Sequence, residues 1–207
     1  MVRLDLDSWC RREAFTHFSR ARNPFYSVTF DVDVTRAAAW AKERGLSFYY
    51  TMTWLCSRAV HQVDALMLDI RGGEVWRLDS RKPSFTDLHP GAEQFHIVTL
   101  PMLEDPEAFC HAARTASEAQ KTFLDESQEG RDLIYITCLP WVRMTGLTTT
   151  LDADPDDCVP RVSWGRWEEC GGRKILGLCM EVNHRTVDGI HIGQFVRALE
   201  DAIAGLD

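Results

Sequence analysis

The chain has 207 residues, of which 45% are hydrophobic and 26% are charged, and its formal net charge is -8. These values are typical of a globular protein that can bury a sizeable core, and we expect a single domain over residues 1–207. The negative balance argues against a general nucleic-acid or anionic-membrane surface, but it leaves room for a local basic pocket that binds an anionic cofactor. No apolar run approaches the roughly 18 residues of a membrane span.

Cysteine usage and the absence of common motifs narrow the class further. Seven cysteines are scattered without a C-x-x-C pair, and the N-terminus lacks an apolar signal core. This pattern predicts reduced, mostly buried thiols in a cytoplasmic protein. The G-x-S-x-G, P-loop, G-x-G-x-x-G and H-E-x-x-H motifs are absent. His184 and His191 have no third ligand at suitable spacing, so we expect no metal site.

The first half of the chain alternates between strand and helix patterns. Residues 26–34 show the two-residue period of a half-buried strand. Thr35 is placed to cap a helix that Gly45 would end. A second helix is predicted over residues 51–63, and a hairpin is predicted around Gly72-Gly73.

Strands dominate the second half. A helix is predicted from Pro106 to Phe123, with proline in its first turn. Strands are expected at 95–100, 133–139, 161–167 and 174–182. Gly171-Gly172 is predicted to turn between the last two strands, residues 152–157 form an acidic surface loop, and a final helix begins near Ile192. This order favours one large mixed sheet over regular strand–helix alternation.

The motif with the clearest chemical meaning is His184-x-x-x-Asp188-Gly189, which lies between the last strand and the last helix. Histidine changes its protonation state near neutral pH, so one held at a strand end suits a general base. The alternative is a purely structural turn in which Asp188 caps the last helix and His184 is incidental.

Five further segments, taken with this motif, resemble the chloramphenicol acetyltransferase family. They run in order through most of the chain: Trp9–Phe15 (W-x-R-[RK]-E-H-F), Phe48-Tyr49 (F-Y-P), Val75–Ser80 with Pro83–Thr86 (V-W-D-S and P-x-F-T), His89, and Leu139–Val142 (L-P-W-V). The residues from 183 to 189 also resemble the D-H-R-x-x-D-G motif of dihydrolipoyl acyltransferase domains, which share that family's fold and mechanism.

The resemblance implies an α/β fold, a two-layer α+β sandwich with a large mixed sheet. It implies an O-acetyltransferase that moves an acetyl group from acetyl-coenzyme A to a hydroxyl of a small molecule, without a metal and through a ternary complex. Chloramphenicol or another compound would be the acceptor, and antibiotic resistance would follow in the first case. It also implies a homotrimer whose active sites lie between subunits.

Individual roles carry over to matching positions. His184 would be the catalytic base, and Asp188 would form a bidentate pair with Arg11 that holds the turn. Gly189 would supply a positive-φ turn or close packing. The alternative for Arg11 is a solvated surface charge.

The oxyanion region departs from the family pattern. Gly146 stands where the family has a serine that steadies the oxyanion, with Thr145 and Thr148 nearby as substitutes. Loss of one such donor typically costs roughly 10²–10³ in turnover.

The binding residues also follow from the resemblance. The acceptor would contact Phe18, Pro24, Tyr26, Phe95 and Ile97. Arg22, next to this set, either points to solvent or indicates a more polar or anionic acceptor. Trp167 and Arg166 would bind coenzyme A.

Two other functions remain open. One is the same transfer with a different acyl donor or acceptor, including a lipoyl-like thiol. The other is a catalytically impaired ligand-binding member that lacks the oxyanion serine.

Overall fold

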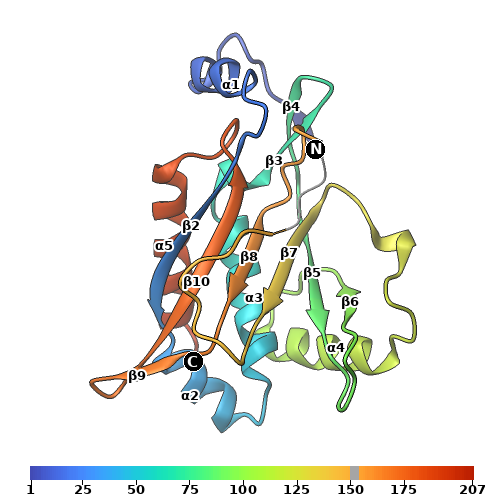
Figure 1. The fold of residues 1–207 in the computed structure, drawn as a ribbon, viewed down its shortest axis with the longest axis vertical. Coiled ribbons are helices and arrows are strands. Elements are labelled where there is room, and N and C mark those ends of the chain that lie inside the picture. Colours follow the sequence, from blue (N-terminus) through green and yellow to red (C-terminus); the bar gives the residue numbers. More distant parts are fainter. Residues whose placement is uncertain (150–153) are drawn as a thin grey trace.

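The computed structural model describes residues 1–149 and 154–207. Its helices are α1 (Arg12–Phe18), α2 (Thr35–Glu43), α3 (Phe48–His61), α4 (Pro106–Ala119) and α5 (Gly189–Ala204), with 3-10 turns η1 (Asp64–Met67) and η2 (Glu126–Gln128). Its strands are β1 (Val2–Arg3), β2 (Phe25–Asp33), β3 (Leu68–Arg71), β4 (Glu74–Arg77), β5 (Lys82–Asp87), β6 (His96–Thr99), β7 (Leu133–Cys138), β8 (Arg161–Trp164), β9 (Glu168–Cys170) and β10 (Arg173–Asn183). Figure 1 shows their arrangement.

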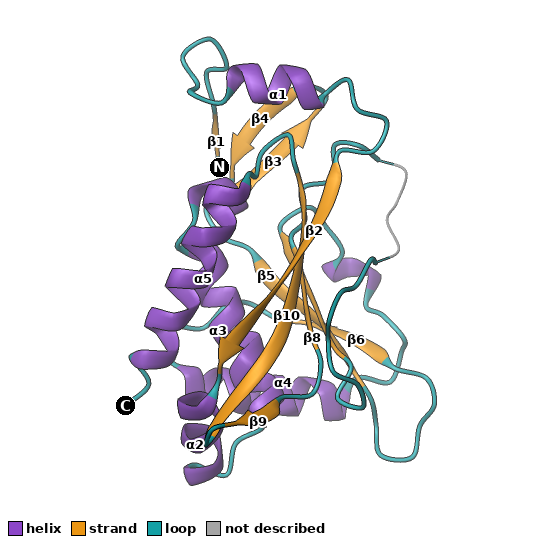
Figure 2. Cartoon of the chain, turned by 60° about the vertical axis from the view of Figure 1, so that its left-hand side comes forward, coloured by secondary structure: helices purple, strands orange, loops and turns teal. Residues whose placement is uncertain are grey.

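The main sheet has seven strands in the order β2-β10-β8-β7-β5-β6, with β9 paired to β10. The central pairs β5–β7 and β7–β8 are parallel, and β10 pairs antiparallel with β2, β8 and β9. A small sheet, β1-β4-β3, lies at the end of the main sheet that is near α1 (Figure 2). The predicted mixed α/β fold with one large mixed sheet is therefore confirmed.

Helices α2, α3, α4 and α5 lie on one side of the main sheet (Figure 2). The central helix, α3, contacts α2, α4, α5 and strands β5 and β7. Ten of its residues are buried, among them Met52, Leu55 and Val60 from the predicted apolar face. The helix begins at Phe48, before the predicted start, because the Ser47 hydroxyl accepts from the Tyr50 N–H and caps it. Among the described residues, no helix is long and apolar enough to cross a bilayer.

Further element boundaries differ from the sequence prediction. Helix α4 ends at Ala119 instead of reaching Phe123, whose carbonyl accepts from the Ile97 N–H at 2.8 Å and so ties the following segment to β6. Thr35 does not cap α2: it is the first helical residue, and its N–H donates to the Asp33 carboxylate. Residues 161–167 are not one strand, because β8 ends at Trp164 and β9 follows separately.

Both predicted glycine turns are present. Gly72-Gly73 joins β3 to β4, with φ of 58° and 84°, in the left-handed region that favours glycine. Gly171-Gly172 joins β9 to β10, with φ of 57° and 78°.

One buried arginine connects the small sheet to the main sheet. The Arg81 guanidinium is fully buried and donates to five backbone carbonyls. Those of Leu66 and Leu68 lead into β3, and that of Leu133 begins β7. Burial lowers the pKa of Arg81 to about 10, so the side chain stays charged at neutral pH. Its carbonyl partners satisfy this charge and fix the position of β3.

Candidate active site

His184 is the first residue after β10, and among the described residues its ring is held by packing. Its backbone N–H donates to the Pro24 carbonyl at 2.8 Å. The imidazole stacks on Phe18, with centroids 3.9 Å apart and planes 13° apart, and Tyr26 lies 4.5 Å away on a tilted ring. Nδ1 is buried without a hydrogen-bond partner. The aromatic neighbours therefore set the direction in which Nε2 points.

Asp188 both caps helix α5 and contacts Arg11, which are the two roles that the sequence left open. Its Oδ1 accepts from the Gly189 N–H at 2.7 Å, and the Asp188 N–H donates to Nδ1 of His191 at 2.9 Å, so the residue caps α5. Its Oδ2 lies 3.3 Å from Nη1 of Arg11. The Gly189 N–H bond and the Arg11 charge hold the pKa of Asp188 below its usual value.

The Arg11 contact is present but is not the bidentate pair that was expected. Only Nη1 reaches Asp188, while Nη2 donates to the His184 carbonyl at 3.5 Å. The Arg11 side chain is 14% exposed, so it is not a solvated surface charge. One guanidinium thus bridges the first and fifth residues of the motif, while Oδ1 of Asp188 accepts from the Gly189 N–H.

The expected reason for Gly189 is wrong. It is the first residue of α5 and its φ is not positive. A Cβ built there meets nothing within 4 Å in this chain. A helical position needs no left-handed backbone, so neither turn geometry nor close packing requires glycine here.

Three buried polar atoms around this turn have no hydrogen-bond partner in the described part of the chain: Nδ1 of His184, the Tyr26 hydroxyl and Nε of Arg11. Burial, together with the negative charge of Asp188, raises the pKa of Tyr26 to about 12. Buried polar groups are normally paired, and exceptions call for an explanation such as a catalytic role or an ordered water. Their concentration beside His184 marks this turn as a candidate functional site.

The structure separates the expected acceptor residues into two groups. Phe18, Pro24 and Tyr26 surround His184. Phe95 and Ile97 lie at β6, on the far edge of the sheet, which is four strand spacings from β10. At about 4.8 Å per strand, that distance is roughly 19 Å. Arg22 is exposed.

The oxyanion region is also distant from His184 within one chain. The segment that contains Thr145 and Gly146 lies along β10: the Leu147 carbonyl accepts from Sγ of Cys179 at 3.4 Å. Cys179 precedes His184 by five residues of a strand, a distance of roughly 16 Å at 3.3 Å per residue. Thr145, Gly146 and Thr148 are exposed, and a Cβ on Gly146 meets nothing within 4 Å.

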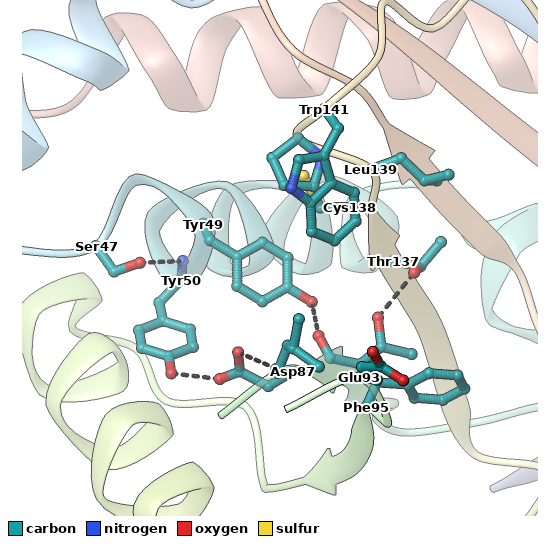
Figure 3. Close-up of a pocket in the computed structure, with 13 residues that line it drawn as sticks. Ser47, Tyr49, Tyr50, Asp87, Glu93, Phe95, Thr137, Cys138, Leu139 and Trp141 are labelled. Atoms are coloured by element: carbon teal, nitrogen blue, oxygen red, sulfur yellow. Dashed lines mark hydrogen bonds between the residues drawn. The ribbon is translucent and has the colours of Figure 1, made fainter. Parts of the chain in front are cut away.

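A separate pocket of about 540 Å³ opens between the start of α3, β5 and the end of β7 (Figure 3). Its aromatic wall includes Tyr49, Tyr50, Phe95 and Trp141. The Tyr50 hydroxyl donates to Oδ2 of Asp87 at 2.5 Å. The sequence did not identify this pocket, although two matched motifs, F-Y and L-P-W-V, contribute to it.

The expected cofactor residues lie near this pocket. The Trp167 ring packs edge-on against Phe48 at 4.7 Å, and Phe48 is adjacent to Ser47 and Tyr49 of the pocket lining. Nζ of Lys174 lies 5.3 Å from the Trp167 ring centroid. The Arg166 N–H donates to the Val142 carbonyl at 2.7 Å. Across the described parts of the chain, no group of three or more His, Cys, Asp or Glu side chains is placed to hold a metal ion.

Comparison with known structures identifies the class of fold. A solved chloramphenicol acetyltransferase superposes with a TM-score of 0.85 at 23% identity, covering 97% of this chain and 98% of that one. A dihydrolipoamide acetyltransferase from Azotobacter vinelandii gives a TM-score of 0.68 at 15% identity, covering 93% of this chain and 86% of that one. The fold is therefore one that acetyltransferases share.

Sequence comparison narrows this class to a family. The family model for chloramphenicol acetyltransferase matches residues 1–200. Chloramphenicol acetyltransferase 3 of Escherichia coli is 28% identical over 204 residues, covering 97% of this chain and 95% of the relative. A chloramphenicol acetyltransferase of Streptomyces acrimycini is 28% identical over 207 residues, covering 97% and 93%. The chain belongs to the chloramphenicol acetyltransferase family.

Proposed function

We propose that the protein transfers an acetyl group from acetyl-coenzyme A to a hydroxyl of a small molecule, with His184 as general base. Nδ1 of His184 is buried between aromatic rings, which leaves Nε2 as the nitrogen that reaches substrate. Nε2 removes the hydroxyl proton while the oxygen attacks the thioester carbonyl. The tetrahedral intermediate then collapses, the thiolate of coenzyme A leaves, and His184 returns the proton to it. The sandwiched imidazole is the observation that carries this proposal.

The complete site would form between copies of the chain, as in a homotrimer. His184 lies at one end of β10, while Gly146 and the aromatic pocket with Phe95 lie well away from it in the same chain. A reacting hydroxyl must be within hydrogen-bond reach of its base. A neighbouring copy that brings its pocket to His184 would close this distance.

Acetyl-coenzyme A would bind on the pocket side of the sheet. Trp167 offers an aromatic face there, and Lys174 together with Arg166 offers positive charge for the phosphates of the cofactor. No metal takes part in this scheme.

The direct test is release of free thiol from acetyl-coenzyme A in the presence of a panel of alcohols that includes chloramphenicol. Turnover by the wild-type protein that falls by about 10³-fold or more in His184→Ala supports the proposal, since loss of a general base typically costs 10²–10⁴-fold. Turnover that survives His184→Ala would contradict the role of the base.

The same assay separates the alternatives. Acyl transfer only with another acyl-coenzyme A, or only to a thiol acceptor, would indicate a different donor or acceptor. Tight ligand binding without turnover, indifferent to His184→Ala, would indicate a binding protein. The alternative of a ligand-binding protein without turnover is supported by Gly146, which has no hydroxyl to offer an oxyanion.

A further inference from the structure

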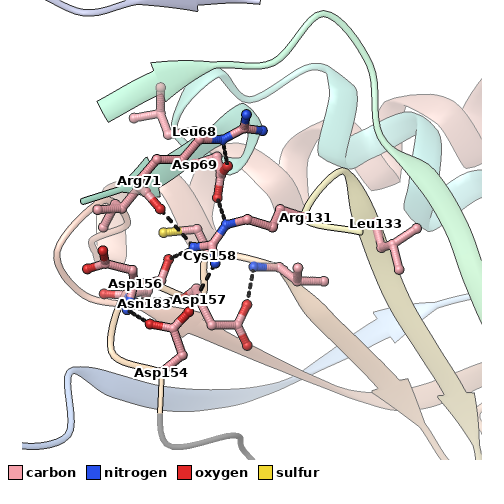
Figure 4. Close-up of polar contacts among 12 residues, drawn as sticks. Leu68, Asp69, Arg71, Arg131, Leu133, Asp154, Asp156, Asp157, Cys158 and Asn183 are labelled. Carbon is pink, nitrogen blue, oxygen red and sulfur yellow. Dashed lines mark hydrogen bonds and ion pairs between the residues drawn. The ribbon is translucent and has the colours of Figure 1, made fainter. Parts of the chain in front are cut away.

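The residues on both sides of His184 hold the same loop, residues 155–157. The Asn183 side-chain amide donates to the carbonyls of Pro155 and Asp157, at 2.8 and 2.9 Å. Nη1 of Arg185 donates to the Pro155 carbonyl at 3.1 Å. Figure 4 shows Asn183 beside this loop. Although the sequence indicates an acidic surface loop here, its contacts make it the support on which the His184 turn rests.

Arg185 also connects this loop to helix α1. Its Nη1 lies 2.5 Å from Oδ1 of Asp156, and its Nε donates to the Ser19 hydroxyl at 2.9 Å. The guanidinium lies over the Phe15 ring, 4.9 Å from its centroid. The Arg185 side chain is only 8% exposed, so its charge depends on these contacts.

Arg131 holds the same loop by contacts that do not involve Arg185. Arg131 donates to the Asp154 carboxylate at 3.0 Å and to the Asp156 carbonyl at 2.5 Å. The same guanidinium donates to Asp69 of β3 at 2.9 Å, and Asp69 is 1% exposed (Figure 4). Asp156 is therefore a fixed anchor for Arg185.

We propose that Arg185, held by Asp156, is a positioning residue for the His184 imidazole. The ring makes no hydrogen bond of its own within the described structure, and Phe18 of α1 is its stacking partner. Phe15 and Ser19, the α1 contacts of Arg185, flank Phe18 in the sequence. Arg185 thus holds together the backbone that carries the base and the helix that carries the face against which the base stacks. The kinetic part of this inference rests on the proposed function.

The test compares Arg185→Met and Asp156→Asn with Glu104→Gln as a matched control. Glu104 forms a surface pair with Arg58, makes no hydrogen bond or ion pair with the described residues named above, and has a side chain that is 91% exposed. We expect kcat to fall by about tenfold in Asp156→Asn and by up to about a hundredfold in Arg185→Met, the scale of a 1 Å misplacement of a catalytic group. The KM for acetyl-coenzyme A should stay within about twofold of the wild-type value. Glu104→Gln should retain the wild-type kcat.

A second measurement works without any turnover. Stacking between Phe18 and Tyr26 should shift the His184 ring-proton resonances upfield, and His184→Ala identifies them. In folded Arg185→Met and Asp156→Asn these resonances should move toward ordinary histidine values, while in Glu104→Gln they stay in place. Folded variants that keep both the shifted resonances and the wild-type kcat would overturn the inference. If the wild-type protein has no turnover, the proposed function fails, and the resonances alone decide whether Arg185 positions the ring.

Discussion

The turn at His184 and the pocket lined by Trp141 differ in how densely charged side chains hold them. The turn is dense and polar: Arg11, Asp188 and Arg185 hold it in place around a single stacked imidazole. The pocket is a cavity of about 540 Å³ with aromatic walls. His184 lies at the turn, and the aromatic pocket lies well away from it in the same chain. The proposed acetyl transfer needs both the base and the pocket, so we do not expect one copy of the chain to be active by itself.

The test of this contrast with the largest expected effect is complementation between two variants. His184→Ala removes the base, and Phe95→Asp places a charge in the pocket at a side chain that is 44% exposed, so that folding should survive. Each variant alone should be nearly inactive. Co-expressed, they should recover about a quarter of wild-type activity, because each interface needs one intact partner of each kind and random assembly gives half of each.

The control for complementation is to mix the two variants after separate purification, under conditions where subunits do not exchange. Activity should then stay at the level of the separate variants. A co-expressed mixture that is no more active than its components would mean that base and pocket work within one chain.

Gly146→Ser sharpens the contrast by adding the hydroxyl that the family resemblance leads us to expect at this position. A Cβ at Gly146 would meet no atom of the described residues within 4 Å, so the substitution should not disturb them. We expect kcat to rise by about tenfold, part of the 10²–10³ that an oxyanion donor typically contributes. Gly146→Ala, which adds the Cβ without the hydroxyl, should leave kcat unchanged. A large fall in Gly146→Ser would show that this position does not face the oxyanion.

The smallest expected effect concerns the contribution of His96, in strand β6 beside the pocket residue Phe95, to the stability of the protein. His96 of β6 is 5% exposed, and burial, followed by the neighbouring His89, lowers its pKa. The unfolded chain therefore binds this proton more readily than the folded one, and stability falls as pH drops below about 6.5. Tm should decrease by a few degrees between pH 7 and pH 5, and His96→Gln should reduce that slope.

Exposed His111 provides the control for this titration. His111→Gln should retain the wild-type dependence of Tm on pH. If His96→Gln also retained it, His96 would not be the group responsible.

Local sequence patterns predicted most of the elements. The alternation over 26–34 predicted β2, and the apolar spacing from Ile192 predicted α5, because these periods report which face of a segment is buried. Helix α4 was predicted too long, since its end depends on the pairing of Phe123 with β6, a contact that no local pattern records. Strand β5 was not predicted, because its place between β6 and β7 is set by its neighbours in the sheet.

The sequence by itself determined the family, the mixed fold and the motif from His184 to Gly189, because these depend on residue types at fixed spacing. The tertiary structure decided how those residues are used. It placed Phe18 and Tyr26 on His184, divided Arg11 between Asp188 and a carbonyl, and separated Phe95 from His184. It also made the acidic loop a support for Arg185. Distances between segments far apart in the chain arise only when the sheet assembles, so spacing along the sequence does not contain them.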